Sequence, residues 1–307
     1  MSGLSNAPRF TSKPSWLRVN LPTGERYRFL KETLSERRLN TVCEEARCPN
    51  VGECWGGGTA TFMVLGDTCT RGCRFCAVKT QKRGTPVDPD EPAKVAESIK
   101  LMDLEYVVIT SVDRDDLPDQ GARHFADVIQ TVKSETGILV EVLIPDFRAD
   151  EKALQIIVDA KPDVVAHNVE TVRRLTPSVR DARATYDQSL RVLNTLKRLR
   201  SNLLTKSSLM VGLGETGDEL KEAFGDLRRE GVNFLTLGQY LQPSQKHLGV
   251  VRYLTPEEFD RLADMARTFG FDYVASGPLV RSSYRAGEFL VKSLLEKRGE
   301  VGYADSK

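Results

Sequence analysis

The chain has 307 residues and a net charge of +1, from 44 Lys and Arg against 43 Asp and Glu. This neutral balance disfavours sequence-independent nucleic-acid binding, which depends on an excess of basic side chains facing phosphates. No apolar run reaches the roughly 18 residues of a membrane span, and the opening residues lack the apolar core of a signal peptide, so we expect a cytoplasmic protein that binds neither nucleic acid nor membranes.

The N-terminal residues are predicted to precede the main folded unit. Residues 1–24 are rich in proline and lack periodicity, which predicts an extended arm. Residues 25–39 are predicted to form a one-sided helix, because Tyr27, Leu30 and Leu34 recur at helical spacing.

A cysteine-containing loop and a buried strand come next. The loop is predicted from residue 43 and ends in Trp55 and three glycines. Residues 59–65 (TATFMVL) are apolar or β-branched throughout, which predicts a buried strand. Further cysteines follow this strand directly, so they should lie at its carboxyl end.

From residue 91 onward, helical and strand patterns alternate. Helices are predicted at 91–102, 121–135, 150–160, 185–200, 217–230 and 256–269, and strands at 106–111, 138–144, 163–168, 203–212 and 232–240. With the strand at 59–65 there are six strands, and such alternation predicts a parallel sheet with right-handed crossovers. Six units fit a partial (β/α)6 barrel of the TIM type, and a doubly wound open sheet is the alternative. In either fold, functional groups collect at the carboxyl ends of the strands.

All six cysteines lie between Cys43 and Cys76. In a reducing cytoplasm, thiols clustered in this way are typical of metal ligands rather than of disulfides. They form two groups of three, CxxxxCxxxxxC (Cys43, Cys48 and Cys54) and CxxxCxxC (Cys69, Cys73 and Cys76). Neither group has the paired CxxC elements of a structural zinc site, and histidine is too scarce to complete both. A [4Fe–4S] cluster takes four ligands, so three cysteines would leave one iron open for substrate.

The CxxxCxxC group carries the aromatic residue Phe75 before its third cysteine and follows the first strand of a repeated β/α domain. In these features the chain resembles the radical S-adenosylmethionine (SAM) enzymes. The resemblance implies that Cys69, Cys73 and Cys76 hold a [4Fe–4S] cluster whose open iron binds the amino and carboxylate groups of SAM. A ferredoxin-like electron carrier is the alternative, although such carriers usually have four protein ligands.

Five further segments narrow the resemblance: CEEARCPNVGECW at 43–55, TSVDRDDLPDQGA at 110–122, HNVETV at 167–172, MVGLGET at 210–216 and RSSY at 281–284. In this order they resemble the lipoyl synthase family, from about residue 13 to 290. The resemblance implies an auxiliary [4Fe–4S] cluster on Cys43, Cys48, Cys54 and Ser283, with Ser283 and Arg281 as candidates for its turnover. From its composition alone, RSSY is a polar turn that caps a helix.

The same resemblance implies the reaction, its cofactors and its partners. Two sulfur atoms would be inserted at C6 and C8 of a protein-bound octanoyl-lysine, with two [4Fe–4S] clusters and SAM as co-substrate. The carriers would be lipoyl domains of 2-oxoacid dehydrogenase complexes and the glycine-cleavage H protein. A reductant such as ferredoxin or flavodoxin and an iron–sulfur carrier would serve the clusters. Another sulfur-inserting radical enzyme, such as a methylthiotransferase, is the enzymatic alternative.

Polar residues at the strand ends are candidates for SAM contacts, and each could instead cap a helix or join a salt bridge. Acidic groups suit ribose hydroxyls and the ammonium group of SAM. With Phe75, the candidates are Thr110, Asp113, Glu141, Asn168, Glu170 and Lys206. The chain is therefore expected to divide into an extension over 1–58 with the auxiliary cysteines, a partial barrel over 59–277, and a segment over 278–307 that returns to the auxiliary cluster.

Overall fold

The computed structural model describes residues 13–18, 25–37, 39–41, 50–56, 59–104 and 106–283. Cys43, Cys48 and Tyr284 lie outside these ranges. Eight strands form one sheet in the order β1, β2, β5, β6, β7, β8, β9, β10. Their bounds are β1 Asn40–Thr41, β2 Thr59–Val64, β5 Tyr106–Ser111, β6 Leu139–Leu143, β7 Val164–Ala166, β8 Leu204–Val211, β9 Phe234–Gln239 and β10 Tyr273–Gly277. Strands β3 Thr68–Cys69 and β4 Lys79–Thr80 pair separately in parallel.

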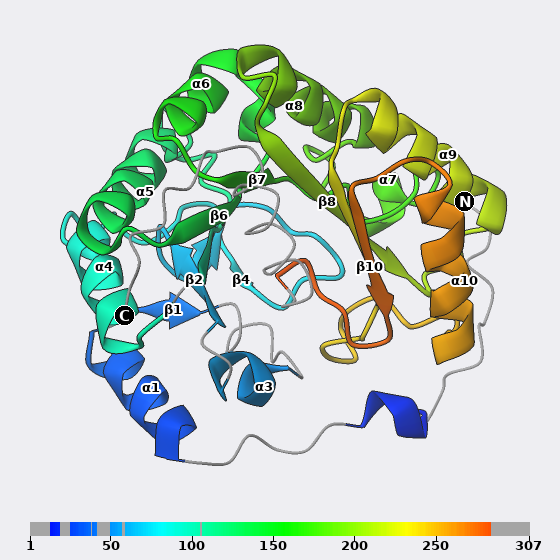
Figure 1. The fold of residues 1–307 in the computed structure, drawn as a ribbon, viewed down its shortest axis with the longest axis horizontal. Coiled ribbons are helices and arrows are strands. Elements are labelled where there is room, and N and C mark those ends of the chain that lie inside the picture. The colour runs from blue at the N-terminus through cyan, green and yellow to red at the C-terminus, as the bar shows by residue number, and fades with distance from the viewer. Residues whose placement is uncertain are drawn as a thin grey trace, which may run out of the picture.

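Helices connect the strands and cover the outer side of the sheet. The main helices are α4 Glu91–Leu101, α5 Ala122–Thr136, α6 Glu151–Asp159, α8 Tyr186–Leu199, α9 Gly217–Arg229 and α10 Pro256–Arg267. In Figure 1 these helices form an arc around the strands. The shorter or N-terminal ones are η1 Ser15–Leu17, α1 Glu25–Glu36, α3 Val51–Gly56, η2 Phe147–Ala149 and α7 Thr176–Val179.

The strand order identifies a partial barrel rather than a doubly wound sheet. From β2 to β10 every neighbouring pair is parallel, and the strands follow one another in chain order. A doubly wound sheet reverses its strand order at a switch point, and no reversal occurs here. Strands β1 and β10 stand at opposite ends of this order, so among the described strands the barrel is not closed by pairing.

The structure corrects three expectations. The sheet has seven parallel strands rather than six, because β10 pairs with β9 over five residues. Its Ala275, Ser276 and Gly277 carry little intrinsic strand preference, so the pairing with β9 determines it. Cys54 lies in helix α3 rather than in a loop. The expected extended arm contains the 3-10 turn η1 in its described part.

The core divides into two outer layers and one small inner cluster. The larger layer packs β2, β5 and β6 against α4, α5 and α6, and the second packs β8 and β9 against α9 and α10. Inside the barrel, Tyr106, Val108, Val164, Leu204 and Phe234 fill its amino-terminal end. The carboxyl end is thereby left to the loops and their polar side chains. Among the described helices, none is long and apolar enough to cross a membrane.

Candidate functional site

The CxxxCxxC loop begins at the carboxyl end of β2, within the arc of helices (Figure 1). Leu65 and Gly66 have φ angles of +67° and +88°, and turn the chain out of the strand. A Cβ on Gly66 would lie 2.1 Å from Oγ1 of Thr85, so the turn requires glycine. This turn positions Cys69, Cys73 and Cys76 at the mouth of the barrel.

The sulfur atoms of two of these cysteines accept backbone hydrogen bonds. The Arg71 N–H donates to Cys69 Sγ (3.4 Å), and the Asp181 N–H donates to Cys73 Sγ (3.3 Å). Such donors stabilise charge on sulfur, which is one way in which proteins tune iron–sulfur clusters. The second donor comes from the segment before α8, so the cysteine loop is joined to that segment at the Cys73 sulfur.

Burial raises the pKa of the Cys69 and Cys73 thiols to about 12, and Asp113 adds to the effect on Cys69. It also raises the pKa of Cys76. Buried thiols of this kind lose their protons when a metal binds, because a coordinating thiol is deprotonated to the thiolate. Among the described residues, no three His, Cys, Asp or Glu side chains converge on a single metal ion. Three thiolates on one loop are the donor set that a [4Fe–4S] cluster takes, with one cysteine bound to each of three irons.

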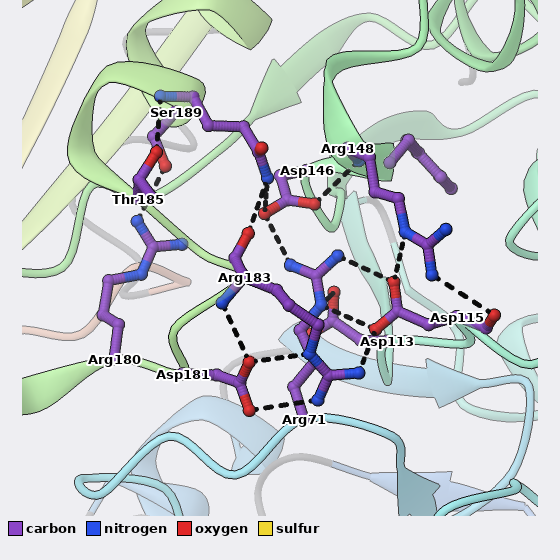
Figure 2. A network of polar contacts seen from close by, with 12 residues as sticks. Arg71, Asp113, Asp115, Asp146, Arg148, Arg180, Asp181, Arg183, Thr185 and Ser189 are labelled. Atoms are coloured by element: carbon purple, nitrogen blue, oxygen red, sulfur yellow. Dashed lines mark hydrogen bonds and ion pairs between the residues drawn. The ribbon is translucent and has the colours of Figure 1, made fainter. Parts of the chain in front are cut away.

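Arg71, between Cys69 and Cys73, is the centre of a buried ion network (Figure 2). Its guanidinium donates from Nε to Asp115 Oδ2 (2.8 Å) and from Nη1 to Asp146 Oδ2 (2.5 Å), and lies 3.4 Å from Asp113 Oδ1. Burial alone would lower the pKa of Arg71, but the hydrogen bonds to Asp115 and Asp146 raise it. The loop of cluster cysteines is thus fastened to the ends of β5 and β6.

Other charged residues extend the network to the segment before α8. Arg148 and Arg183 both pair with Asp115, at 3.0 and 3.2 Å. Arg183 also pairs with Asp181, and the Asp181 carboxylate accepts a hydrogen bond from the Gly72 N–H (2.8 Å). Burial raises the pKa of Asp115, but its arginine partners lower it to about 2. Arginines therefore favour the ionised form of Asp115, Asp146 and Asp181, whereas burial raises the pKa of Asp113 to about 6.

Asp146 reaches Arg71 from a strained turn. The next three residues, Phe147, Arg148 and Ala149, have φ angles of +44°, +52° and +55°. Each non-glycine residue in this left-handed region costs roughly 1–2 kcal/mol. The buried Phe147 side chain, the Asp146 carboxylate that accepts from the Arg148 N–H, and the Arg148–Asp115 pair offset this cost. Strain of this kind is concentrated at functional sites.

Replacing Arg71 with methionine is expected to lower the free energy of unfolding by about 3–5 kcal/mol, because Asp115 and Asp146 lose their shared buried partner. Chemical denaturation followed by circular dichroism measures the loss. Arg198→Met is the control, since Arg198 pairs with Glu151 on the exposed surface and its removal should leave the unfolding midpoint unchanged. Equal midpoints for the two variants would contradict a structural role for the network.

Several predicted SAM contacts are engaged with other side chains. Lys206 Nζ lies 2.8 Å from Glu141 Oε1, and Tyr106 donates to Glu141 Oε2 (2.6 Å), all three groups being buried. This cluster lies beside the apolar residues that fill the amino-terminal end of the barrel. Thr110 donates to the Leu143 carbonyl (2.8 Å) across the sheet. These residues stabilise the barrel interior from which the site is built.

Asn168 and Glu170 lie just after β7 and contact each other, with Asn168 Nδ2 donating to Glu170 Oε1 (3.1 Å). Glu170 has a φ of +66°. Burial raises the pKa of Glu170, and the Glu170 charge in turn raises the pKa of Cys76, so the two groups are close. The buried Asn168 Oδ1 has no hydrogen-bond partner among the described residues. Such orphaned atoms at a strand end suit ligand binding.

Two residues that the sequence did not single out also reach the site. Arg180 is buried, and its charge acts to lower the pKa of Cys73. His247, in the segment after β9, places Nε2 2.9 Å from the Cys76 carbonyl. The neighbouring Leu248 N–H donates to the Arg74 carbonyl (3.2 Å). An arginine is common and the His247 contact spans 171 positions of sequence, so no local signal marked either residue. Phe75, half-buried, packs on the apolar layer of β8 and β9.

The auxiliary-cluster residues are described only in part. Cys54 is buried in α3, beside Trp55, whose ring packs 5.2 Å from that of Tyr27. Asn50, four residues before Cys54, donates from Nδ2 to the Leu279 carbonyl (2.6 Å), four residues before Ser283. Arg281 Nη1 donates to the Gln239 carbonyl (3.3 Å). The segment that carries Ser283 therefore returns to the helix that carries Cys54.

Comparison with known families adds independent support. Residues 63–227 match the model of the radical SAM superfamily, and residues 5–48 match the N-terminal domain of lipoyl synthase of the radical SAM family. Among solved structures, methylornithine synthase has a TM-score of 0.53 at 13% identity, covering 89% of this chain and 92% of that one. The hydrogenase maturase HydG from Carboxydothermus hydrogenoformans has a TM-score of 0.53 at 14% identity, covering 90% and 72%. These likenesses support the fold.

Curated relatives are much more similar in sequence. Lipoyl synthase of Anaeromyxobacter dehalogenans is 60% identical over 93% of this chain and 97% of its own length. That of Myxococcus xanthus is 59% identical over 94% and 96%, and the mitochondrial lipoyl synthase of Danio rerio is 56% identical over 93% and 73%. With the cysteine loop at the mouth of a partial barrel, these matches show that the chain belongs to the lipoyl synthase family of radical SAM sulfurtransferases.

Proposed function

We propose that this chain inserts two sulfur atoms, at C6 and C8, into an octanoyl group carried on a lysine of a lipoyl domain. The observation that carries the proposal is the cysteine loop: Cys69, Cys73 and Cys76 lie at the mouth of the barrel beside Asn168, Glu170 and Arg180. Both target carbons bear unactivated C–H bonds, which no side-chain base or nucleophile attacks. A radical cofactor is therefore required.

Membership of the family brings SAM and iron–sulfur clusters as cofactors. When bound, they supply a 5′-deoxyadenosyl radical for hydrogen abstraction and sulfide for insertion. We assign the radical cluster to Cys69, Cys73 and Cys76, and a second [4Fe–4S] cluster to Cys43, Cys48, Cys54 and Ser283. The contact between Asn50 and Leu279 supports the second assignment, because it joins the helix of Cys54 to the segment of Ser283.

The residues of the barrel mouth would bind and orient SAM. Glu170 suits the ammonium group or the ribose of the ligand. The Asn168 Oδ1, which has no partner among the described residues, can accept a hydrogen bond from either ligand group. Arg180 suits the ligand carboxylate, because its guanidinium is buried and its Nε has no partner among the described residues. Asp113, 3.7 Å from Cys69 Sγ, lies at the same mouth. Phe75, Thr110, Glu141 and Lys206 shape the surrounding barrel.

The proposal extends to the partners and to the division of the chain. The lipoyl domains of 2-oxoacid dehydrogenase complexes and the glycine-cleavage H protein are the proposed carriers. Ferredoxin or flavodoxin would deliver electrons, and an iron–sulfur carrier would rebuild the second cluster, in the cytoplasm. Residues 1–58 would supply the auxiliary cysteines, 59–277 the barrel, and 278–307 the segment with Ser283 and Arg281.

The deciding experiment incubates the anaerobically reconstituted protein with an octanoyl-lysine peptide, SAM and dithionite. Mass spectrometry should detect a lipoyl-lysine product together with 5′-deoxyadenosine, and iron analysis should give about eight iron atoms per chain on the cube stoichiometry. Formation of 5′-deoxyadenosine without any sulfur in the peptide would favour a different radical enzyme. No 5′-deoxyadenosine at all would favour an electron carrier.

A further inference from the structure

Arg180 is a buried cation that forms no ion pair with a described residue, although its charge acts to lower the pKa of Glu170 and of Asp113. Among the described residues, no carboxylate lies within ion-pair distance of its guanidinium, although 92% of its surface is covered. Its Nη1 donates to Ser189 Oγ (2.7 Å), while the Val169 carbonyl is at 3.5 Å, the limit of a hydrogen bond. Its buried Nε has no partner there. Burying a guanidinium that forms no ion pair costs free energy of folding unless an anion binds it.

Ser189 joins Arg180 to His167. The hydroxyl lies 2.9 Å from His167 Nε2, and the other ring nitrogen, Nδ1, lies 3.0 Å from the Ile144 carbonyl. All three side chains are buried. Figure 2 shows Arg180 and Ser189 at the edge of the ion network that surrounds the cysteine loop. The three residues form a chain of hydrogen bonds that runs from the end of β6 to the mouth of the barrel, where the cysteine loop lies.

The hydrogen positions in this chain follow from chemistry. Burial, together with the charge of Arg180, lowers the pKa of His167 to about 4, so the ring is neutral at neutral pH. A carbonyl can only accept, so the ring proton is on Nδ1, and Nε2 is left as an acceptor. The Ser189 hydroxyl must then donate to Nε2. Its oxygen lone pairs consequently face Arg180 and accept from Nη1.

We propose that Ser189 and His167 are positioning residues that orient the Arg180 guanidinium toward the carboxylate of SAM. This inference rests on the proposed function and deepens it. The hydroxyl holds Nη1 on one side, which leaves Nε free for the ligand. Without it, Arg180 loses the 2.7 Å hydrogen bond to Ser189 and His167 Nε2 loses its donor, so the guanidinium is no longer held in a single orientation.

The test compares two ligands and two buried serines. Ser189→Ala, reconstituted with its clusters, should bind SAM about tenfold more weakly than the parent protein, as expected for a lost hydrogen bond to a charged group. Binding of decarboxylated SAM, which lacks the carboxylate, should not change. Ser98→Ala is the matched control, because Ser98 is equally buried in α4 and donates only to the Lys94 carbonyl. It should bind both ligands as the parent does, with affinities measured by equilibrium dialysis.

A double substitution tests whether Ser189 acts through Arg180. Arg180→Gln should weaken SAM binding, and adding Ser189→Ala to it should have no further effect. Equal weakening for both ligands, or additive effects of the two substitutions, would overturn the proposal. If Ser189→Ala fails to fold, His167→Gln is expected to show the same preference for loss with SAM. If the parent protein binds SAM but forms no 5′-deoxyadenosine, the proposed function fails. The binding measurements on the Ser189 and Arg180 variants still decide this inference.

Discussion

Cys73→Ala is expected to abolish formation of both 5′-deoxyadenosine and lipoyl product. Cys73 is one of three thiols on the loop after β2, and its sulfur accepts the Asp181 N–H from the segment before α8. With two cysteines left, the radical cluster has too few protein ligands, so no electron reaches SAM. Chromatography of 5′-deoxyadenosine after incubation with dithionite measures the loss.

The iron content of the same variant supplies the control. Cys73→Ala should keep the auxiliary cluster and so retain about four iron atoms per chain, roughly half the content of the parent protein. Retention of about eight iron atoms, or undiminished 5′-deoxyadenosine, would show that Cys73 is not a ligand of the radical cluster.

Ser283→Ala is expected to separate the cleavage of SAM from the insertion of sulfur. 5′-Deoxyadenosine should still form, because Ser283 is remote in sequence from the cysteine loop and belongs to the segment that returns to α3. Lipoyl product should fall at least about tenfold, or vanish, because a hard alkoxide ligand among soft thiolates is the one most readily protonated and released. The measurement is the ratio of 5′-deoxyadenosine to sulfur inserted into an octanoyl-lysine peptide.

Ser282→Ala is the matched control for this prediction. Ser282 and Ser283 are adjacent in the same turn and both are half-buried. The Ser282 variant should keep the parent ratio of sulfur inserted to 5′-deoxyadenosine. Normal lipoyl formation by Ser283→Ala, or an equal loss in both variants, would refute the assignment of Ser283 as the fourth ligand.

Together these variants test a division of the site into two parts, the barrel mouth and the region of α3 with the returning C-terminal segment. The barrel mouth carries the thiols, Asn168, Glu170 and Arg180, and is suited to bind and cleave SAM. Helix α3 lies on the side of the barrel that the arc of helices leaves uncovered (Figure 1), and the Asn50–Leu279 hydrogen bond joins the returning segment to the start of this helix.

The ion network around Arg71 explains why the cysteine loop can be short and still well placed. Asp113 and Asp115 come from the end of β5, and Asp146 comes from the end of β6. Each strand end therefore contributes a carboxylate to one guanidinium on the loop. Arg71 of the loop and the carboxylates at the strand ends together fix the loop position, and the strand ends are the face at which barrel enzymes place their chemistry.

The sequence by itself determined the two cysteine groups, the alternation of strands and helices, and the family resemblance, since these depend on local spacing and on residue chemistry. The strand and helix pattern alone left a doubly wound sheet as the alternative, the partial barrel that we predicted is confirmed, and β10 was missed. Strand order is a property of non-local pairing, which periodicity does not report.

Only the tertiary structure decided which polar strand-end residues meet. Glu141 and Lys206 are separated by 65 positions and pair with each other inside the barrel, whereas Asn168 and Arg180 keep buried atoms without a partner among the described residues. A polar or charged side chain at a strand end can pair with another side chain or bind a ligand. The sequence pattern does not distinguish a residue that pairs from one that binds. The distances between strands β6, β7 and β8 made that distinction, because a buried charge pairs with whichever opposite charge the sheet brings within reach.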